Sequence, residues 1–151
     1  MKLSTRALLS SALLAGSLLS AGAVTATAAH AAGGCSGTLI GRKAITYSGS
    51  TIGELAVYYN SSTGNNCAQT NHLGASYGVK AETTVTIERC TQTTKQDIYC
   101  TPVSGTYSID KNDYAYFAGP VSVHSPNNCI RATGLIAWKG SRPSALFVGG
   151  C

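Results

Sequence analysis

The chain has 151 residues, with eleven basic residues against six acidic ones and a net charge of +5. This length suits a single domain. The basic residues beyond the amino-terminal segment are scattered, apart from Arg42 and Lys43. Because nucleic-acid binding requires a clustered basic stripe, composition argues against nucleic acid as a partner.

The first 31 residues have the layout of a secretory signal peptide. Lys2 and Arg6 precede an uncharged run rich in Ala, Leu and Ser over residues 7–24, and Ala29-His30-Ala31 provides an A-x-A cleavage site, with residues 26–28 as an alternative. We therefore expect residues 1–31 to be removed and residues 32–151 to form a secreted domain. Loss of Lys2 and Arg6 leaves nine basic and six acidic residues, a net charge of +3.

Two alternatives would keep the chain at a membrane. A membrane anchor is disfavoured because the apolar run is short and is broken by Ser and Gly. Lipid attachment at Cys35 is disfavoured because no Leu or Val precedes its small neighbours, and because it would leave an odd number of cysteines. We expect no membrane association after cleavage.

All six cysteines lie beyond the signal peptide, at Cys35, Cys67, Cys90, Cys100, Cys129 and Cys151. An even number in a secreted domain predicts three disulfides. Zinc binding is disfavoured, because there is no C-x-x-C pair and only His72 and His124 remain in this part of the chain. We therefore expect no metal and no cofactor.

Short strands and polar turns account for the whole domain. The alternation of Val79, Thr83 and Ile87 with polar residues gives the clearest strand, and Leu55 and Val57 share the expected inner face of another. Strands are expected at residues 42–47, 55–60, 67–70, 79–88, 98–103, 106–109, 114–118, 121–123, 135–138 and 144–148. Residues 110–113 are expected to form a turn, and Gly119-Pro120 to break or bend its strand. With no helical period, the fold class is an antiparallel β-sandwich or small barrel.

The cysteine spacing suggests a pairing scheme. Cys90 and Cys100 lie at the feet of an apparent hairpin, and we expect them to pair. A near-neighbour scheme then joins Cys129 to Cys151 and Cys35 to Cys67, whereas the main alternative joins Cys35 to Cys151. Asn-Asn-Cys occurs twice, at residues 65–67 and 127–129, each time after a strand and a polar turn.

Two blocks carry a family resemblance. Residues 114–123, followed by Asn128-Cys129-Ile130, and residues 58–67 are similar to the actinobacterial secreted proteins called spore-associated protein A. The terminal Cys151 and the export signal match as well. The resemblance implies a secreted protein at the cell or spore surface and supplies no catalytic residue. The members carry cysteines equivalent to Cys35, Cys67, Cys129 and Cys151, so Cys90 and Cys100 are an added pair, which supports their pairing with each other.

Catalytic chemistry finds little support in the sequence. There is no G-x-S-x-G nucleophile elbow. A ribonuclease-like acid–base site would need His124, Arg131 and one glutamate, from among Glu54, Glu82 and Glu88. The spacing of these residues in the sequence does not indicate such a site. His72 and His124 are interpreted as loop or turn residues, and Asp110 and Asp113 as turn formers. We assign no catalytic residue and expect a non-enzymatic protein, with a small hydrolase as the third alternative.

Binding is the better supported class of function. The chain has eight tyrosines, and Tyr114 and Tyr116 are expected to share one strand face, where they form a candidate binding surface; the alternative is that they belong to the core. The second candidate is a protease inhibitor that presents the loop closed by Cys90 and Cys100, with Lys95 as its anchoring side chain. The leading prediction is a secreted, non-enzymatic domain that acts at the cell or spore surface, with its partner and ligand unknown.

Overall fold

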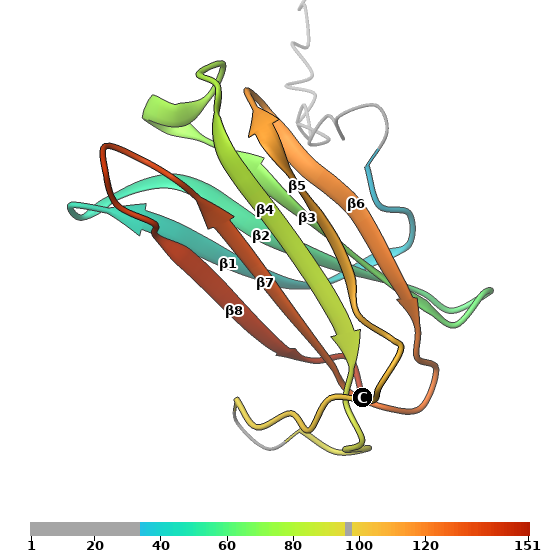
Figure 1. Cartoon of the computed structure of the whole chain (residues 1–151). Helices are drawn as coiled ribbons and strands as arrows, with labels where there is room; N and C mark the ends of the chain where they lie inside the picture. The colour runs from blue at the N-terminus through green and yellow to red at the C-terminus, as the bar shows by residue number, and fades with distance from the viewer. Residues whose placement is uncertain (1–33, 96–97) are drawn as a thin grey trace, which may run out of the picture.

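Two four-stranded antiparallel sheets pack face to face as a β-sandwich (Figure 1). The computed structural model describes residues 34–95 and 98–151. In order across the first sheet lie β1 (Thr38–Tyr47), β2 (Ser50–Asn60), β3 (Asn65–His72) and β6 (Phe117–His124). Across the second lie β5 (Ser108–Tyr114), β4 (Ala81–Arg89), β7 (Ile130–Ile136) and β8 (Ser144–Gly149). A 3₁₀ turn, η1 (Gly74–Ser76), connects β3 to β4.

The expected signal peptide, residues 1–31, and its cleavage site lie outside the described residues. Among the residues that are described, no helix is long and apolar enough to cross a membrane.

The core lies between the sheets and follows the predicted alternation. On β4, Thr83, Val85 and Ile87 are fully buried, and on β2 the same is true of Leu55 and Val57. Successive side chains of a strand point to opposite faces, so one face of each sheet can be apolar while the other meets solvent. The prediction of an all-β sandwich is confirmed, and so is the inner face of β2.

β2 is buried on its outer face as well. Ala56 is fully buried and Tyr58 almost so, and both pack against Cys35. The segment that begins at Cys35 covers this face and is attached to β3 through the Cys35–Cys67 disulfide. The covering segment explains why two consecutive side chains of this strand can both be buried.

The position of β5 corrects two predictions. Residues 110–113, expected as a turn, lie inside β5, and the turn falls instead at Ala115 and Tyr116, in the middle of an expected strand. Pairing with β4 runs from Ile87 opposite Ser108 to Ala81 opposite Tyr114 and overrides the local turn preference. The Asp110 carboxylate accepts hydrogen bonds from the Tyr114 hydroxyl (2.8 Å) and the Gly119 amide (2.6 Å). The Asp110 carboxylate therefore has hydrogen-bond partners without a turn at residues 110–113.

Of two further strand predictions, the irregularity expected at Gly119-Pro120 is present, and the strand expected at residues 98–103 needs correction. β6 continues through Gly119 and Pro120, with an irregular register opposite Ala68 and Thr70 of β3. The strand bends rather than ends, and Pro120 is tolerated because β6 lies at the edge of its sheet. Residues 98–103, expected to complete a hairpin, form a loop that meets the end of β4 through a bridge between Cys90 and Pro102 and a hydrogen bond from the Val103 amide to Arg89 O (2.8 Å).

The three disulfides follow the near-neighbour scheme. Cys35 pairs with Cys67, Cys90 with Cys100, and Cys129 with Cys151, so the alternative link between Cys35 and Cys151 is wrong. In each Asn-Asn-Cys sequence, one asparagine side chain donates a hydrogen bond to a backbone carbonyl of a loop. Asn66 Nδ2 donates to Ser125 O (3.0 Å), and Asn128 Nδ2 donates to Thr91 O (3.1 Å). Three disulfides indicate an oxidising compartment, consistent with an extracellular protein.

The sandwich has two contrasting ends. The disulfide end contains the β2–β3 turn, the loop at residues 90–107 and the loop at residues 125–129, and all three disulfides lie towards it. We call the opposite end the histidine end, after His72, the last residue of β3. It contains the β1–β2, β5–β6 and β7–β8 turns together with η1 (Figure 1).

Candidate functional site

Two exposed tyrosines lie together at the histidine end. Tyr77 follows η1 and Tyr116 lies in the β5–β6 turn, and their side chains are 64% and 54% exposed. The ring centroids are 5.1 Å apart, and the ring planes meet at 65° in an edge-to-face arrangement. Val79, also exposed, follows Tyr77 by two residues. We call Tyr77 and Tyr116 the tyrosine pair.

Backbone hydrogen bonds join the two segments that carry the pair. The His72 amide donates to Tyr116 O, and the Gly78 amide donates to Ala115 O, both at 2.8 Å. Gly78 has a φ of +81°, and an added Cβ would come within 4.0 Å of the Tyr116 ring. A glycine accommodates this left-handed conformation without strain. The pair is therefore pre-organised, and little conformational entropy remains to be lost when a partner binds.

The buried side chain of His72 supports the segment that carries Tyr77. Its side chain is 1% exposed and lies between Ser76 of η1 and Thr83 of β4. Nδ1 donates to Ser76 O (2.9 Å), and the Thr83 hydroxyl lies 2.6 Å from Nε2. The Ser76 hydroxyl in turn donates to Ile52 O on β2. One imidazole thus connects η1 to both sheets.

Burial favours the neutral form of the His72 ring. Burial lowers its pKa below the ordinary value of 6.5, and the hydrogen bond to Ser76 O opposes this only partly. The Thr83 hydroxyl lies between Nε2 and Ala81 O (2.9 Å), and its single proton can be donated to one of these two acceptors. This environment assigns His72 a structural role in shaping the loop, in place of the polar-loop histidine expected from the sequence.

Tyr114 does not form one surface with Tyr116. It ends β5, is half-buried and packs against the core, whereas Tyr116 lies in the turn. Its hydrogen bond to Asp110 is the main reason that the pKa of the Tyr114 hydroxyl is raised. The expected shared strand face is therefore wrong, and the neighbour of Tyr116 is Tyr77. Sequence reasoning missed Tyr77 because its loop has no periodic pattern, and only the glycines on either side suggested a turn.

A cationic cluster lies on the outer side of the second sheet at the same end. The Glu82 carboxylate contacts Lys111 Nζ through one oxygen (3.1 Å) and the Arg142 guanidinium through the other. The hydrogen bonds from Arg142 and from Lys111 lower the pKa of Glu82. Lys80 precedes β4 and is exposed, without an ion pair among residues 34–95 and 98–151. One carboxylate therefore contacts two cations, and Lys80 lies two residues before it in the chain.

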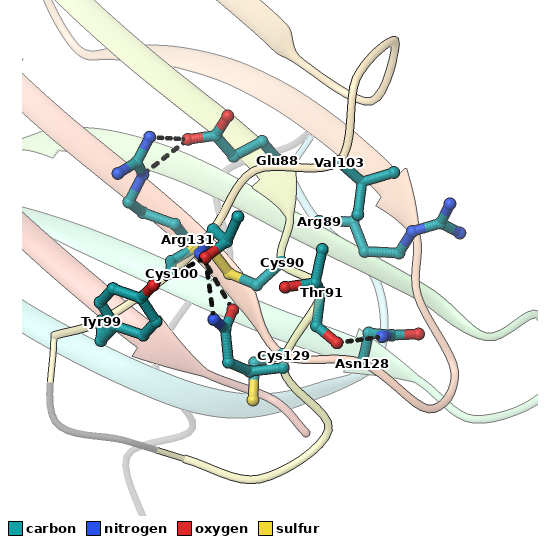
Figure 2. Close-up of a disulfide and its surroundings, with 12 residues drawn as sticks. Glu88, Arg89, Cys90, Thr91, Tyr99, Cys100, Val103, Asn128, Cys129 and Arg131 are labelled. Atoms are coloured by element: carbon teal, nitrogen blue, oxygen red, sulfur yellow. Dashed lines mark hydrogen bonds and ion pairs between the residues drawn. A yellow bond between two sulfur atoms is a disulfide. The ribbon is translucent and has the colours of Figure 1, made fainter.

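The loop that contains Lys95 extends from the disulfide end. Lys95 is exposed, and residues 96 and 97 next to it lie outside the described residues. The base of the loop is braced by the Gln92 side chain, which bonds to the Thr101 amide (3.0 Å) and hydroxyl (3.1 Å). Figure 2 shows the Cys90–Cys100 disulfide at the base of the loop, with the Asn128 side-chain amide donating to Thr91 O. Tyr99 is 60% exposed on the same loop.

The residues considered for acid–base catalysis have separate structural partners. Glu88 and Arg131 form an ion pair across β4 and β7 (Figure 2), and Glu54 pairs with Arg42 (3.2 Å). His124 is exposed, with Nδ1 3.3 Å from Asn65 Oδ1. Within the described ranges, no group of three or more His, Cys, Asp or Glu side chains could hold a metal.

A shallow hollow lies beside the Cys35–Cys67 disulfide. Its volume is about 270 Å³, and uncharged polar side chains from β2, β3 and β6 contribute to its walls, including Asn60, Asn65 and Ser122. Asn65 is also the partner of His124. The hollow is polar and half open, unlike the apolar, enclosed pockets that bind most small ligands.

Comparison with protein-family models, with curated proteins and with solved structures finds no match for the chain.

Proposed function

We propose that the chain is a secreted, non-enzymatic domain, similar to spore-associated protein A, that acts by contact at the cell or spore surface. The three disulfides support the extracellular part of this proposal, because such links persist in oxidising compartments. The family part depends on the similar sequence blocks at residues 58–67 and 114–123.

The tyrosine pair is the observation that carries the contact function. Tyr77 and Tyr116 are large side chains left exposed on segments that hydrogen bonds hold in place. Tyrosine offers a flat apolar ring and a polar hydroxyl at low conformational cost, which is why it is enriched at binding surfaces. Because the two rings are exposed, they are better placed to contact a binding partner than to stabilise the folded domain.

Fractionation of a producing culture through development tests the location. We expect the protein in the wall or spore fraction, and expect Tyr77→Ala combined with Tyr116→Ala to move it into the medium. The matched control is Tyr99→Ala combined with Tyr107→Ala, since both tyrosines are similarly exposed (60% and 57%) but lie on the loop at the disulfide end. Equal retention of all three proteins would contradict a contact role for the pair.

The non-enzymatic part has its own test. Of the two histidines in the described part of the chain, His124 is exposed, so a catalytic histidine would be expected there rather than at buried His72. We expect His124→Ala to leave surface retention and any phenotype of the secreted protein unchanged. A hydrolytic activity that copurifies with the protein and disappears in this variant would contradict the proposal.

Protease inhibition is the second candidate. The observation that favours it is the brace between Gln92 and Thr101, which holds the base of a disulfide-closed loop that exposes Lys95. If this is the function, a protease that cleaves after lysine should be inhibited tightly, and Lys95→Ala should abolish the inhibition while Lys43→Ala does not. No inhibition of such proteases by the wild-type protein excludes this candidate.

A further inference from the structure

The cationic cluster and the tyrosine pair share one corner of the histidine end. Ala81, at the start of β4, pairs with Tyr114 at the end of β5, and the Gly78 amide bonds to Ala115 O. These contacts place Lys80, between Gly78 and Ala81 in the chain, next to the turn that carries Tyr116. The backbone that carries Lys80 therefore lies beside both segments of the tyrosine pair, at the end of the strand that carries Glu82.

Basic side chains outnumber acidic ones at the corner by one. Lys111 and Arg142 both contact the Glu82 carboxylate, so one negative charge holds two positive ones. Four basic side chains, Lys80, Lys111, Lys139 and Arg142, lie at this corner with three acidic ones, Glu82, Asp110 and Asp113, and Glu54 at the same end is paired with Arg42. Because Glu82 fixes its two partners side by side, an anionic group can meet both cations without first ordering them.

The shape of the corner indicates a polymer rather than a small molecule. Both tyrosine side chains are more than half exposed, whereas small-molecule sites are concave and enclose most of their ligand. A chain laid across the corner can place apolar faces on the rings and anionic groups near the cations. Screening is strong at such an exposed site, so the charges contribute through several weak contacts.

We propose that this corner binds an anionic polysaccharide, with sugar faces against the tyrosine pair and carboxylate or phosphate groups against Lys80, Lys111 and Arg142. The inference rests on the proposed surface function and names the chemistry of the partner. Nucleic acid is disfavoured because the basic residues form a local cluster rather than a stripe along one face.

Binding of the secreted protein to defined polymers tests the inference. The probes are polygalacturonate for carboxylates, a phosphorylated mannan for phosphates, dextran as a neutral polysaccharide and a single-stranded RNA. We expect binding to at least one anionic polysaccharide, loss of that binding at about 1 M salt, where the Debye length falls to ~3 Å, and no binding to dextran. The first two probes distinguish the two anionic groups. Equal binding to dextran, or tighter binding to RNA, would overturn the inference.

Substitutions locate the site. Lys80→Gln with Lys111→Gln, and separately Tyr77→Ala with Tyr116→Ala, should each weaken polysaccharide binding about tenfold or more. The matched controls at the disulfide end, Lys95→Gln and Tyr99→Ala, should bind like the wild type. Controls that lose as much affinity as the site variants would place the binding elsewhere and overturn the proposal.

The two proposals fail in different ways. If the protein stays on the cell or spore surface through the tyrosine pair but binds none of the anionic polysaccharides, the inference fails and the surface function stands. If the protein remains in the medium regardless of the tyrosine pair, the surface function fails, whatever the purified polymers show.

Discussion

The two ends of the sandwich are stabilised by different chemistry. At the disulfide end, two disulfides pack together, and Cys90, Cys100 and Cys129 form a small buried cluster with Val148. At the histidine end, the described residues contain no disulfide, and hydrogen bonds around His72 join the loops. The comparison shows that this domain closes one end covalently, whereas at the other it combines polar buried contacts with exposed aromatic and basic side chains.

The largest expected effect is at the disulfide end. Removal of Cys35–Cys67 through Cys35→Ser and Cys67→Ser should reduce the free energy of unfolding by about 3–4 kcal/mol, because the link closes a long loop of the unfolded chain. Urea denaturation of the oxidised proteins measures this. If this loss is smaller than the loss caused by His72→Ala, the disulfide end is not the more strongly stabilised end.

His72→Ala tests the histidine end directly. It removes a buried ring and its hydrogen bonds to Ser76 and Thr83, so we expect a loss of about 2–3 kcal/mol in urea denaturation. The matched control is His124→Ala, since His124 is exposed, and it should change stability by less than about 0.5 kcal/mol. Equal effects of the two substitutions would show that the His72 network does not hold this end together.

The same histidine should make stability depend on pH. Its folded pKa lies below the unfolded value of 6.5, so its contribution is complete above pH 6.5. As the pH falls below 6.5, the unfolded state takes up a proton first, and stability decreases until the folded pKa is reached. Urea midpoints between pH 7.5 and pH 5 should therefore decrease, and His72→Phe should lessen the decrease. If the urea midpoint of His72→Phe decreases as steeply with pH as that of the wild type, His72 is not the cause of the pH dependence.

Tyr114→Phe tests whether Tyr114 belongs to the scaffold. The substitution removes the hydroxyl that donates to Asp110 but keeps the ring, so we expect a loss of about 1 kcal/mol. Surface retention and polysaccharide binding should stay unchanged. Weaker binding with unchanged stability would mean that Tyr114 is part of the contact surface after all.

The smallest effect on stability is expected for the tyrosine pair itself. Both rings are exposed, so Tyr77→Ala with Tyr116→Ala should alter the free energy of unfolding by less than about 0.5 kcal/mol per residue. Loss of contact function without loss of stability would distinguish this surface from the rest of the histidine end. A large destabilisation would instead make the pair part of the scaffold.

Local pattern alone predicted much of the fold. The alternation in β4, the β2–β3 hairpin and the disulfide between Cys90 and Cys100 could be read from neighbouring residues, because each depends on side-chain period or short chain separation. The turn expected at residues 110–113 is wrong, since those residues pair with β4 inside β5. Tertiary pairing outweighed the turn preference of Asp and Asn.

The candidate site was predicted only in part. Tyr116 was identified, but its partner Tyr77 is 39 positions away in the chain, and no periodic signal connects the two. Glu82, Lys111 and Arg142 come together because β4, β5 and the β7–β8 turn meet at one corner. Charges scattered along the sequence become a cluster through strand order, and strand order is not a local property.

The sequence by itself determined that this protein is a disulfide-bonded all-β domain, because composition, cysteine number and side-chain alternation are local quantities. Only the tertiary structure decided which tyrosines meet and that His72 is buried. It also decided which charges share one carboxylate. Those outcomes depend on long-range strand pairing, whose energy comes from contacts between residues far apart in the chain.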